Sequence, residues 1–81
     1  MKSYIYLVEI YKYTNKEMIH YVLSAYKTRE KAIQVIKDCI KISKKEYDKI
    51  IKGNGDNCIG GIRNSKTNES KIYWINEITL K

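Results

Sequence analysis

The chain has few of the residues on which small catalytic or metal-binding domains depend. Its 81 residues include no proline or phenylalanine, one histidine, two cysteines and four glycines. One histidine and no CxxC pair do not make a conventional zinc site. Two lone cysteines, Cys39 and Cys58, are typical of a protein from a reducing compartment. We therefore expect no metal and no cofactor.

Long apolar runs are also absent. The longest stretch without a charged residue is Met18 to Tyr26, which is nine residues and too short to span a bilayer. The opening MKSYIYLVEI is interrupted by Glu9, and no small-residue cleavage site follows it. These features predict a cytoplasmic protein with no membrane contact. The length, with 43% hydrophobic and 31% charged residues, predicts a single globular domain over residues 1–81.

Extended segments are predicted near both ends of the chain. Residues 4–13, 18–26 and 71–81 are rich in β-branched and aromatic residues, and residues 57–63 form a weaker strand. Thr28 caps a predicted helix whose apolar residues recur at helical spacing. Ser43 and Glu46 form a capping box, which predicts either a second short helix from Lys44 or a kinked continuation of the first. The order ββααββ predicts an α+β fold, with a four-stranded antiparallel sheet and one or two helices on one face.

The four glycines all lie in GNGDNCIGG, residues 53–61. A phosphate-binding loop has a strand before it and a helix after it, whereas here the predicted order is reversed. We expect Gly53 to end the helix in a left-handed conformation and Asn54 to Asp56 to form a turn. Gly60 and Gly61 predict a bulge or a close approach of another backbone.

No pattern of residues indicates catalysis. His20 is the only histidine, and no nucleophile or orienting group stands at a suggestive spacing from it. Asp38 and Asp48 lie among lysines at helical spacings, which predicts ion pairs rather than a catalytic pair of acids. We expect the protein not to be an enzyme.

The predicted strands carry apolar residues on both faces. A sheet with one solvent-exposed face would instead show alternating apolar and polar residues along each strand. Grouping the two acids Glu9 and Glu77 on one side predicts a core beneath the helices made of Val8, Ile10, Ile19, Leu23, Trp74 and Ile78. The opposite side is then a partner-binding outer face formed by Leu7, Tyr11, Val22, Tyr73 and Ile75. An apolar patch on a small protein usually marks an interaction surface, and tyrosine suits one because it adds area with a polar tip.

The net charge of +7 is unevenly distributed. Residues 27–52 hold nine basic and four acidic residues, and thus +5 of the total. The candidate basic surface consists of Lys37, Lys41, Lys44, Lys45, Lys49 and Lys52. Such a face is typical of a protein that binds a polyanion. The alternative is a solvated face with no binding role, in which the lysines reflect an AT-rich genome. Fourteen of the sixteen basic residues are lysine, whereas arginine is the residue that binds phosphate groups bidentately.

The N-terminal part, YLVEIYKY…HYVLSAYKTREKAIQVIKD, is a strand, a reversal, a strand and a T-x-E-x-A helix start. In layout and composition this half of the chain resembles small phage and mobile-element proteins of low-GC bacteria, including anti-CRISPR-type inhibitors of host defence. The resemblance implies a compact, non-enzymatic and dimeric blocker. Many such proteins are acidic, and the charge of +7 departs from that pattern.

Three functions remain open at this point. The first is an inhibitor of a CRISPR-type defence complex that binds a protein or a protein–RNA complex. The second is a nucleic-acid-binding domain that uses the basic surface. The third is a sponge that holds an anionic nucleotide signal between two copies of the chain.

Overall fold

The computed structural model describes residues 3–53 and 57–80, which form one helix and five strands. The elements in chain order are β1 (Ser3–Tyr13), β2 (Met18–Tyr26), α1 (Arg29–Ser43), β3 (Lys49–Lys52), β4 (Cys58–Arg63) and β5 (Ser70–Leu80). The α+β class and the antiparallel sheet that the sequence predicted are therefore present, with five strands in place of four.

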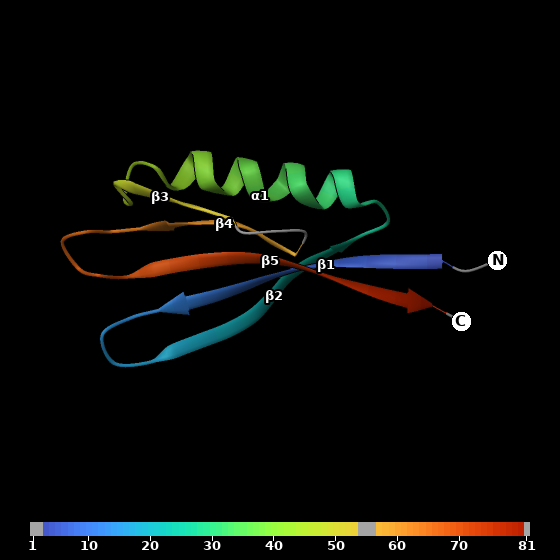
Figure 1. The fold of residues 1–81 in the computed structure, drawn as a ribbon, viewed down its shortest axis with the longest axis horizontal. Coiled ribbons are helices and arrows are strands. Elements are labelled where there is room, and N and C mark those ends of the chain that lie inside the picture. The colour runs from blue at the N-terminus through green and yellow to red at the C-terminus, as the bar shows by residue number, and fades with distance from the viewer. Residues whose placement is uncertain (1–2, 54–56, 81) are drawn as a thin grey trace.

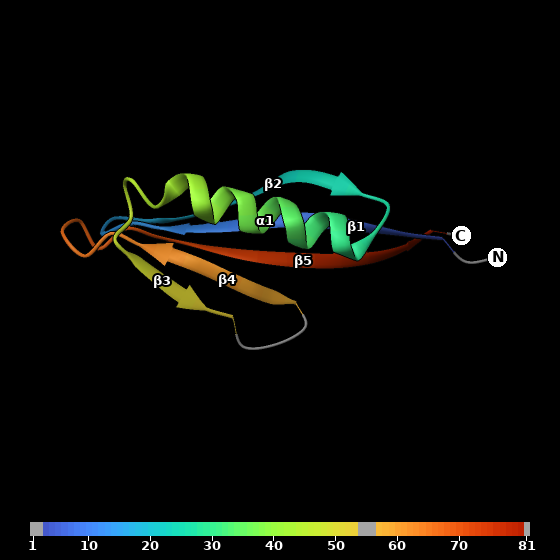
Figure 2. The same cartoon turned by 90° about the horizontal axis from the view of Figure 1, so that it is seen from above.

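All five strands form one antiparallel sheet in the order β2-β1-β5-β4-β3. The two longest strands, β1 and β5, pair over their whole length from Ser3–Leu80 to Tyr13–Ser70 and form its centre. Helix α1 lies over one face of the twisted sheet (Figures 1 and 2). At 15 residues it is about 22 Å long, against about 35 Å for an 11-residue strand, so both central strands extend beyond it.

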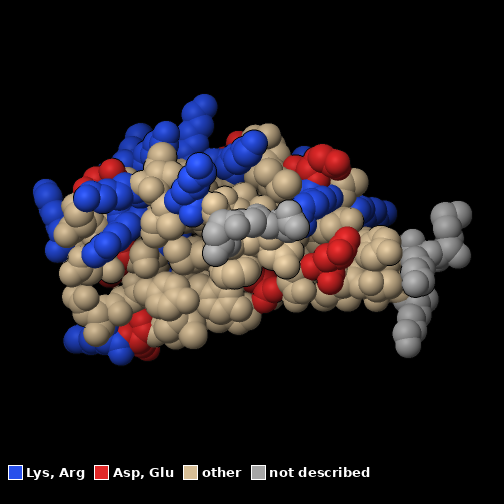
Figure 3. All heavy atoms as spheres, viewed as in Figure 1, with Lys and Arg blue, Asp and Glu red and all other residues tan. Residues whose placement is uncertain are grey.

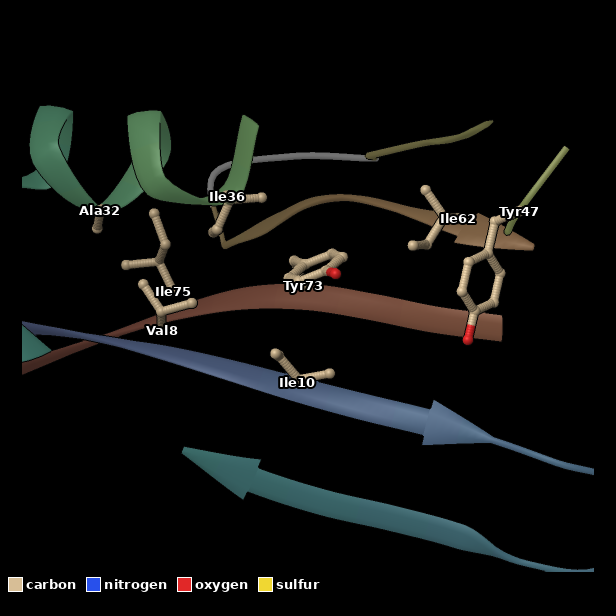
Figure 4. Close-up of a cluster of buried hydrophobic side chains, with 8 residues drawn as sticks. All are labelled: Val8, Ile10, Ala32, Ile36, Tyr47, Ile62, Tyr73 and Ile75. Carbon is tan, nitrogen blue, oxygen red and sulfur yellow. The ribbon is translucent and has the colours of Figure 1, made fainter. Parts of the chain in front are cut away.

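The predicted start of the helix is confirmed. Thr28 is the N-cap, and its hydroxyl accepts a hydrogen bond from the backbone N–H of Lys31 at 3.3 Å. From there the helix presents Ala32 and Ile36 to the sheet, where both are fully buried. The core lies in this single layer between helix and sheet (Figure 4) and consists of Val8, Ile10, Ala32, Ile36, Tyr47, Ile62, Tyr73 and Ile75.

The predicted second helix is wrong, and so is the alternative of a kinked continuation, because α1 ends at Ser43 and no helix follows it among the described residues. After Ser43 the chain makes a turn, in which the N–H groups of Glu46 and Tyr47 both donate to the Ser43 carbonyl at 3.0 Å, and it then forms β3. A helix of about eight residues is marginal by itself. The β-branched pair Ile50 and Ile51 instead forms backbone ladder bonds with β4.

The glycines serve close backbone packing. Gly53 follows β3 instead of ending a helix, so its predicted role is wrong, and the predicted turn at residues 54–56 lies outside the described residues. The predicted bulge is confirmed, because the β4–β5 register shifts between Cys58 and Gly60, and Gly60 has φ +155°. A Cβ on Gly61 would lie 2.3 Å from the Lys71 carbonyl oxygen.

The predicted faces of β5 are reversed. Tyr73 and Ile75, expected on the outer face, are buried under α1, whereas Trp74, expected in the core, lies on the opposite face. The faces of β5 were assigned wrongly because Glu77 was expected on the same side of the sheet as Glu9. Glu77 stands opposite Tyr6 on the helix side of the sheet, where β5 continues beyond the helix and a carboxylate reaches solvent.

Of the other residues predicted for the core, some are buried and some are not. Val8 and Ile10 are buried as expected. Ile19, Leu23 and Ile78 were also expected in the core, but all three are exposed. Ile19 and Leu23 lie on the edge strand β2, and Ile78, which stands opposite Ile5, shares the face of Trp74 on the side of the sheet away from the helix. Among the described residues, no helix has the length and apolar character needed to cross a membrane.

Candidate functional site

The candidate site is the sheet face opposite α1, which we call the outer face. No described helix lies over it (Figures 1 and 2). Strand alternation directs Leu7, Glu9 and Tyr11 of β1 to this face, together with His20 and Val22 of β2 and Trp74 of β5. The face therefore combines aromatic, aliphatic and ionisable side chains across three neighbouring strands.

Four of these side chains contact one another and form what we call the outer-face cluster, defined as Glu9, Tyr11, His20 and Trp74. The His20 ring stacks on Tyr11, its direct cross-strand neighbour, with the ring centroids 4.4 Å apart and the planes at 15°. On the other side of Tyr11, the Trp74 ring meets it edge to face at 6.2 Å and 73°. These are the two geometries that aromatic pairs prefer.

The Glu9 carboxylate holds the imidazole of the cluster in place. His20 Nε2 and Glu9 Oε1 are 2.6 Å apart, and Glu9 is the more buried of the two side chains. The two residues are diagonal neighbours, because Glu9 stands opposite Val22 and Tyr11 opposite His20. A half-buried carboxylate that accepts a hydrogen bond from an imidazole fixes the orientation of that ring. The cluster therefore presents an oriented imidazole within an apolar surface.

Three of the five residues predicted for partner binding lie on this face. Leu7 and Tyr11 are half-buried in β1, and Val22 on the edge strand is 50% exposed. Tyr73 and Ile75 do not belong to the site because they are core residues. The tertiary structure brings the other three together with Trp74.

Sequence reasoning missed Glu9, His20 and Trp74 as members of one site. The cross-strand register carried the missing information: one pairing sets His20 beside Tyr11 and another sets Trp74 beside Glu9. Counting back from the hairpin turn at Thr14 to Glu17 could have found the first pairing. The second joins residues 65 positions apart, and no local signal specifies it.

The six lysines of the predicted basic surface are all exposed, and they come from the helix, from the turn that follows it and from β3. Lys37 and Lys41 lie on α1, and Lys49 and Lys52 lie at the two ends of β3. Figure 3 shows basic side chains over the helix side of the molecule. A shallow hollow at the end of the helix is lined by Lys44, Lys45, Glu46, Asp48, Asn64 and Lys66.

The predicted ion pairs within this region are absent from the described part of the chain. Asp38 accepts a hydrogen bond from Gln34 at 3.0 Å, and Asp48 accepts from both the backbone N–H and the hydroxyl of Ser65. These bonds from Ser65 lower the pKa of the Asp48 carboxyl below its usual value. The Asp48 pairs fail because β3 replaces the helix that would have aligned Asp48 with Lys44 and Lys52, whereas the Asp38 carboxylate, on the helix that did form, is bound by Gln34 instead. Within the described ranges, the one contact of this kind is that of His20 with Glu9, which is an ion pair only when His20 is protonated.

The two cysteine thiols, Cys39 and Cys58, are both free and half-buried. Burial raises the pKa of the Cys39 thiol, which keeps it protonated at neutral pH. Over residues 3–53 and 57–80, no group of three His, Cys, Asp or Glu side chains is arranged to hold a metal ion.

Comparison with known proteins does not place the chain in a family. No family model, curated protein or solved structure matches it significantly. The geometry of the outer face and the distribution of charge are therefore the observations that indicate a function.

Proposed function

We propose that this chain is a small, non-enzymatic binding protein that docks a protein partner through the outer face. The observation that supports this most is the outer-face cluster, in which one tyrosine, one tryptophan and one histidine are stacked on a sheet face that no described helix covers. Tryptophan and tyrosine dominate binding energy at protein interfaces.

The cluster is preorganised, which favours binding. Tyr11 is held between two rings, and the Glu9 carboxylate holds His20, so few side-chain torsions have to be ordered when a partner docks. Burying roughly 400 Å² of apolar surface contributes about 10 kcal/mol before losses. Association costs about 4–15 kcal/mol in lost freedom, so a useful affinity also requires polar and charge complementarity.

The charge of the chain indicates the kind of partner. A protein of net charge +7 associates fastest with an acidic surface, because long-range attraction accelerates the encounter. An inhibitor that blocks a host defence complex, which the resemblance to anti-CRISPR-type proteins implies, would need only such a rigid docking face. We include that role in the proposal.

Capture from a host lysate, with and without nuclease treatment, provides the partner, and titration of wild type and variants against it tests the proposal. Tyr11→Ala should weaken binding about 30-fold or more, the effect of losing a residue that dominates an interface. The matched control is Tyr4→Ala, which truncates an exposed tyrosine of the same strand on the helix side. Equal losses for the two variants would contradict docking through the outer face.

A second candidate function is binding of a nucleic acid by the lysines of the helix side. The observation that favours it is that, over residues 3–53 and 57–80, no lysine lies in an ion pair with a carboxylate of these same residues that would offset its charge. Affinity for a labelled RNA or DNA duplex should then fall about 30-fold or more between 50 and 200 mM salt for three phosphate contacts. Lys44→Glu with Lys45→Glu should reduce that salt dependence to about that of one phosphate contact, whereas Tyr11→Ala should leave it unchanged.

A further inference from the structure

The two edges of the sheet differ in how they are protected. At one edge, β3 has four residues and a lysine at each end, Lys49 and Lys52, and both features discourage the addition of another strand. At the other edge, β2 has nine residues and no formal charge. Its exposed large apolar residues are Met18, Ile19, Tyr21, Val22 and Leu23. No described segment pairs with its outer side.

The hydrogen bonds of the central strands show which β2 residues present free backbone groups. The Ile75 N–H donates to the Asn57 carbonyl at 2.8 Å, which lies on the β4 side of β5. N–H and C=O of one strand residue point to the same side, and the side alternates along the strand. Val8, opposite Ile75, therefore directs its backbone groups toward β2, and Tyr11 directs its groups toward β5.

The same alternation continues into β2. Because Tyr11 turns its backbone groups toward β5, His20 opposite it turns its own N–H and C=O to the open edge. Met18 and Val22 do the same, whereas Ile19 and Tyr21 face β1. The regular run ends at Leu23, because a bulge there shifts the register between the β1 partners Val8 and Glu9.

We propose that β2 pairs with β2 of a second copy of the chain, antiparallel about a two-fold axis at His20. In this register Met18 lies opposite Val22 of the second copy, and His20 lies opposite its own equivalent. All outward backbone groups of the regular run then find partners, because a symmetric antiparallel pair is self-complementary. On the helix side Ile19 lies opposite Tyr21 of the second copy, an aliphatic–aromatic pair that stabilises sheets.

The self-complementary register favours a second copy as the occupant, and the distribution of charge leaves β2 as the edge where two copies can meet. Two chains that each carry +7 repel one another over most of their surfaces. The β2 edge is the longest stretch of the sequence without a charged residue, so there two copies meet with no lysine opposite a lysine. The β3 edge would instead bring Lys49 and Lys52 of both copies together.

This pairing is independent of the proposed function, although the two are compatible. It uses the edge of the sheet, and it would join the outer faces of two copies into one surface across ten strands. The first experiment therefore uses side chains on the helix side of the sheet, which leave the outer-face cluster intact, and the second places a cysteine at His20 and measures pairing of the chains only.

The first experiment measures the dimer dissociation constant by sedimentation equilibrium. Ile19→Lys puts a charge into the proposed junction and should raise the constant about tenfold or more. Ile50→Lys is the matched control, because both residues are isoleucines on the helix side of an edge strand, 40% and 60% exposed. Ile50→Lys should leave the constant within about twofold of wild type. A monomeric wild type at about 1 mM, or equal effects of the two variants, would overturn the proposal.

The second experiment decides the matter if Ile19→Lys does not fold. His20→Cys should form an intermolecular disulfide under mild oxidation, since Cα atoms in a hydrogen-bonded antiparallel pair are about 5.5 Å apart, within the range of disulfides. Wild type, which keeps Cys39 and Cys58, controls for the native thiols, and Ile50→Cys controls for the other edge. Cross-linking of His20→Cys no faster than of either control would overturn the proposed register and pairing.

Discussion

Tyr73 and Trp74 are adjacent in the chain and lie on opposite faces of the sheet. Tyr73 is 2% exposed and packs in the core with Ile36 of the helix, whereas Trp74 meets Tyr11 edge to face on the outer face. This one step along β5 separates the side chain that stabilises the fold from the one available for binding. The first prediction depends on the burial that Tyr73 has on the helix side of the sheet.

Burial raises the pKa of the Tyr73 phenol from 10.0 to about 12. A group whose pKa is raised in the folded state stabilises the protein fully below the unfolded pKa, and that contribution is lost as the pH rises through the folded value. The free energy of unfolding of wild type should therefore fall between pH 10 and 12. Tyr73→Phe should reduce this fall by on the order of 1–2 kcal/mol in urea titrations at several pH values.

Burial also raises the pKa of the Tyr6 and Tyr47 phenols, so Tyr73→Phe should keep a smaller alkaline loss. Identical pH profiles for wild type and Tyr73→Phe would contradict the burial of this phenol.

Ile36 of α1 is 0% exposed and packs in the core between the helix and the sheet. Ile36→Ala should lower the free energy of unfolding by about 2–5 kcal/mol, because it removes buried methyl groups and leaves a cavity. Ile42→Ala on the same helix, where the residue is 75% exposed, should change it by less than about 0.5 kcal/mol. Chemical denaturation measures both, and similar losses would show that α1 packs through another face.

Gly61 lies where β4 and β5 approach closely. A Cβ at this position would lie 2.3 Å from the Lys71 carbonyl oxygen, which belongs to the backbone and cannot move aside cheaply. Gly61→Ala should therefore destabilise the fold by about 1–3 kcal/mol, as overpacking does. Thermal unfolding of this variant beside the exposed-strand control Thr79→Ala measures the effect. An unchanged melting temperature would contradict the close approach of the two backbones.

Asp48 joins the turn after the helix to the loop between β4 and β5 through its hydrogen bonds from Ser65. These bonds hold the pKa of its carboxyl below the usual value, so they stabilise the fold above the usual carboxyl pKa, and the stabilisation is lost as the pH falls through the lowered value. Ser65→Ala should raise the pKa of Asp48, as followed by carboxyl NMR titration.

Ser65→Ala should also shift the acid unfolding midpoint toward higher pH. Ser70→Ala, at the start of β5, is the control and should leave both the pKa of Asp48 and the midpoint unchanged. A carboxyl titration of Asp48 that is the same in wild type and Ser65→Ala would show that the Ser65 hydroxyl does not lower the pKa of Asp48.

Local sequence alone determined the N-terminal hairpin, the capped helix and the strand at the C-terminus. Thr28 and the spacing of Ala32 and Ile36 define the helix without help from distant residues. The β-branched and aromatic residues of β1, β2 and β5 likewise define strands locally. The class of fold followed from these elements.

Tertiary structure alone decided the rest, because the deciding contacts join residues far apart in the chain. Ile50 and Ile51 become a strand since β4 offers them a partner, although the local capping signal favours a helix. The side of β5 that meets the helix is set by pairing with β1, and a strand that is apolar on both sides has no periodic signal to indicate it. For this reason Trp74 joined Tyr11 on the outer face, and Tyr73 entered the core.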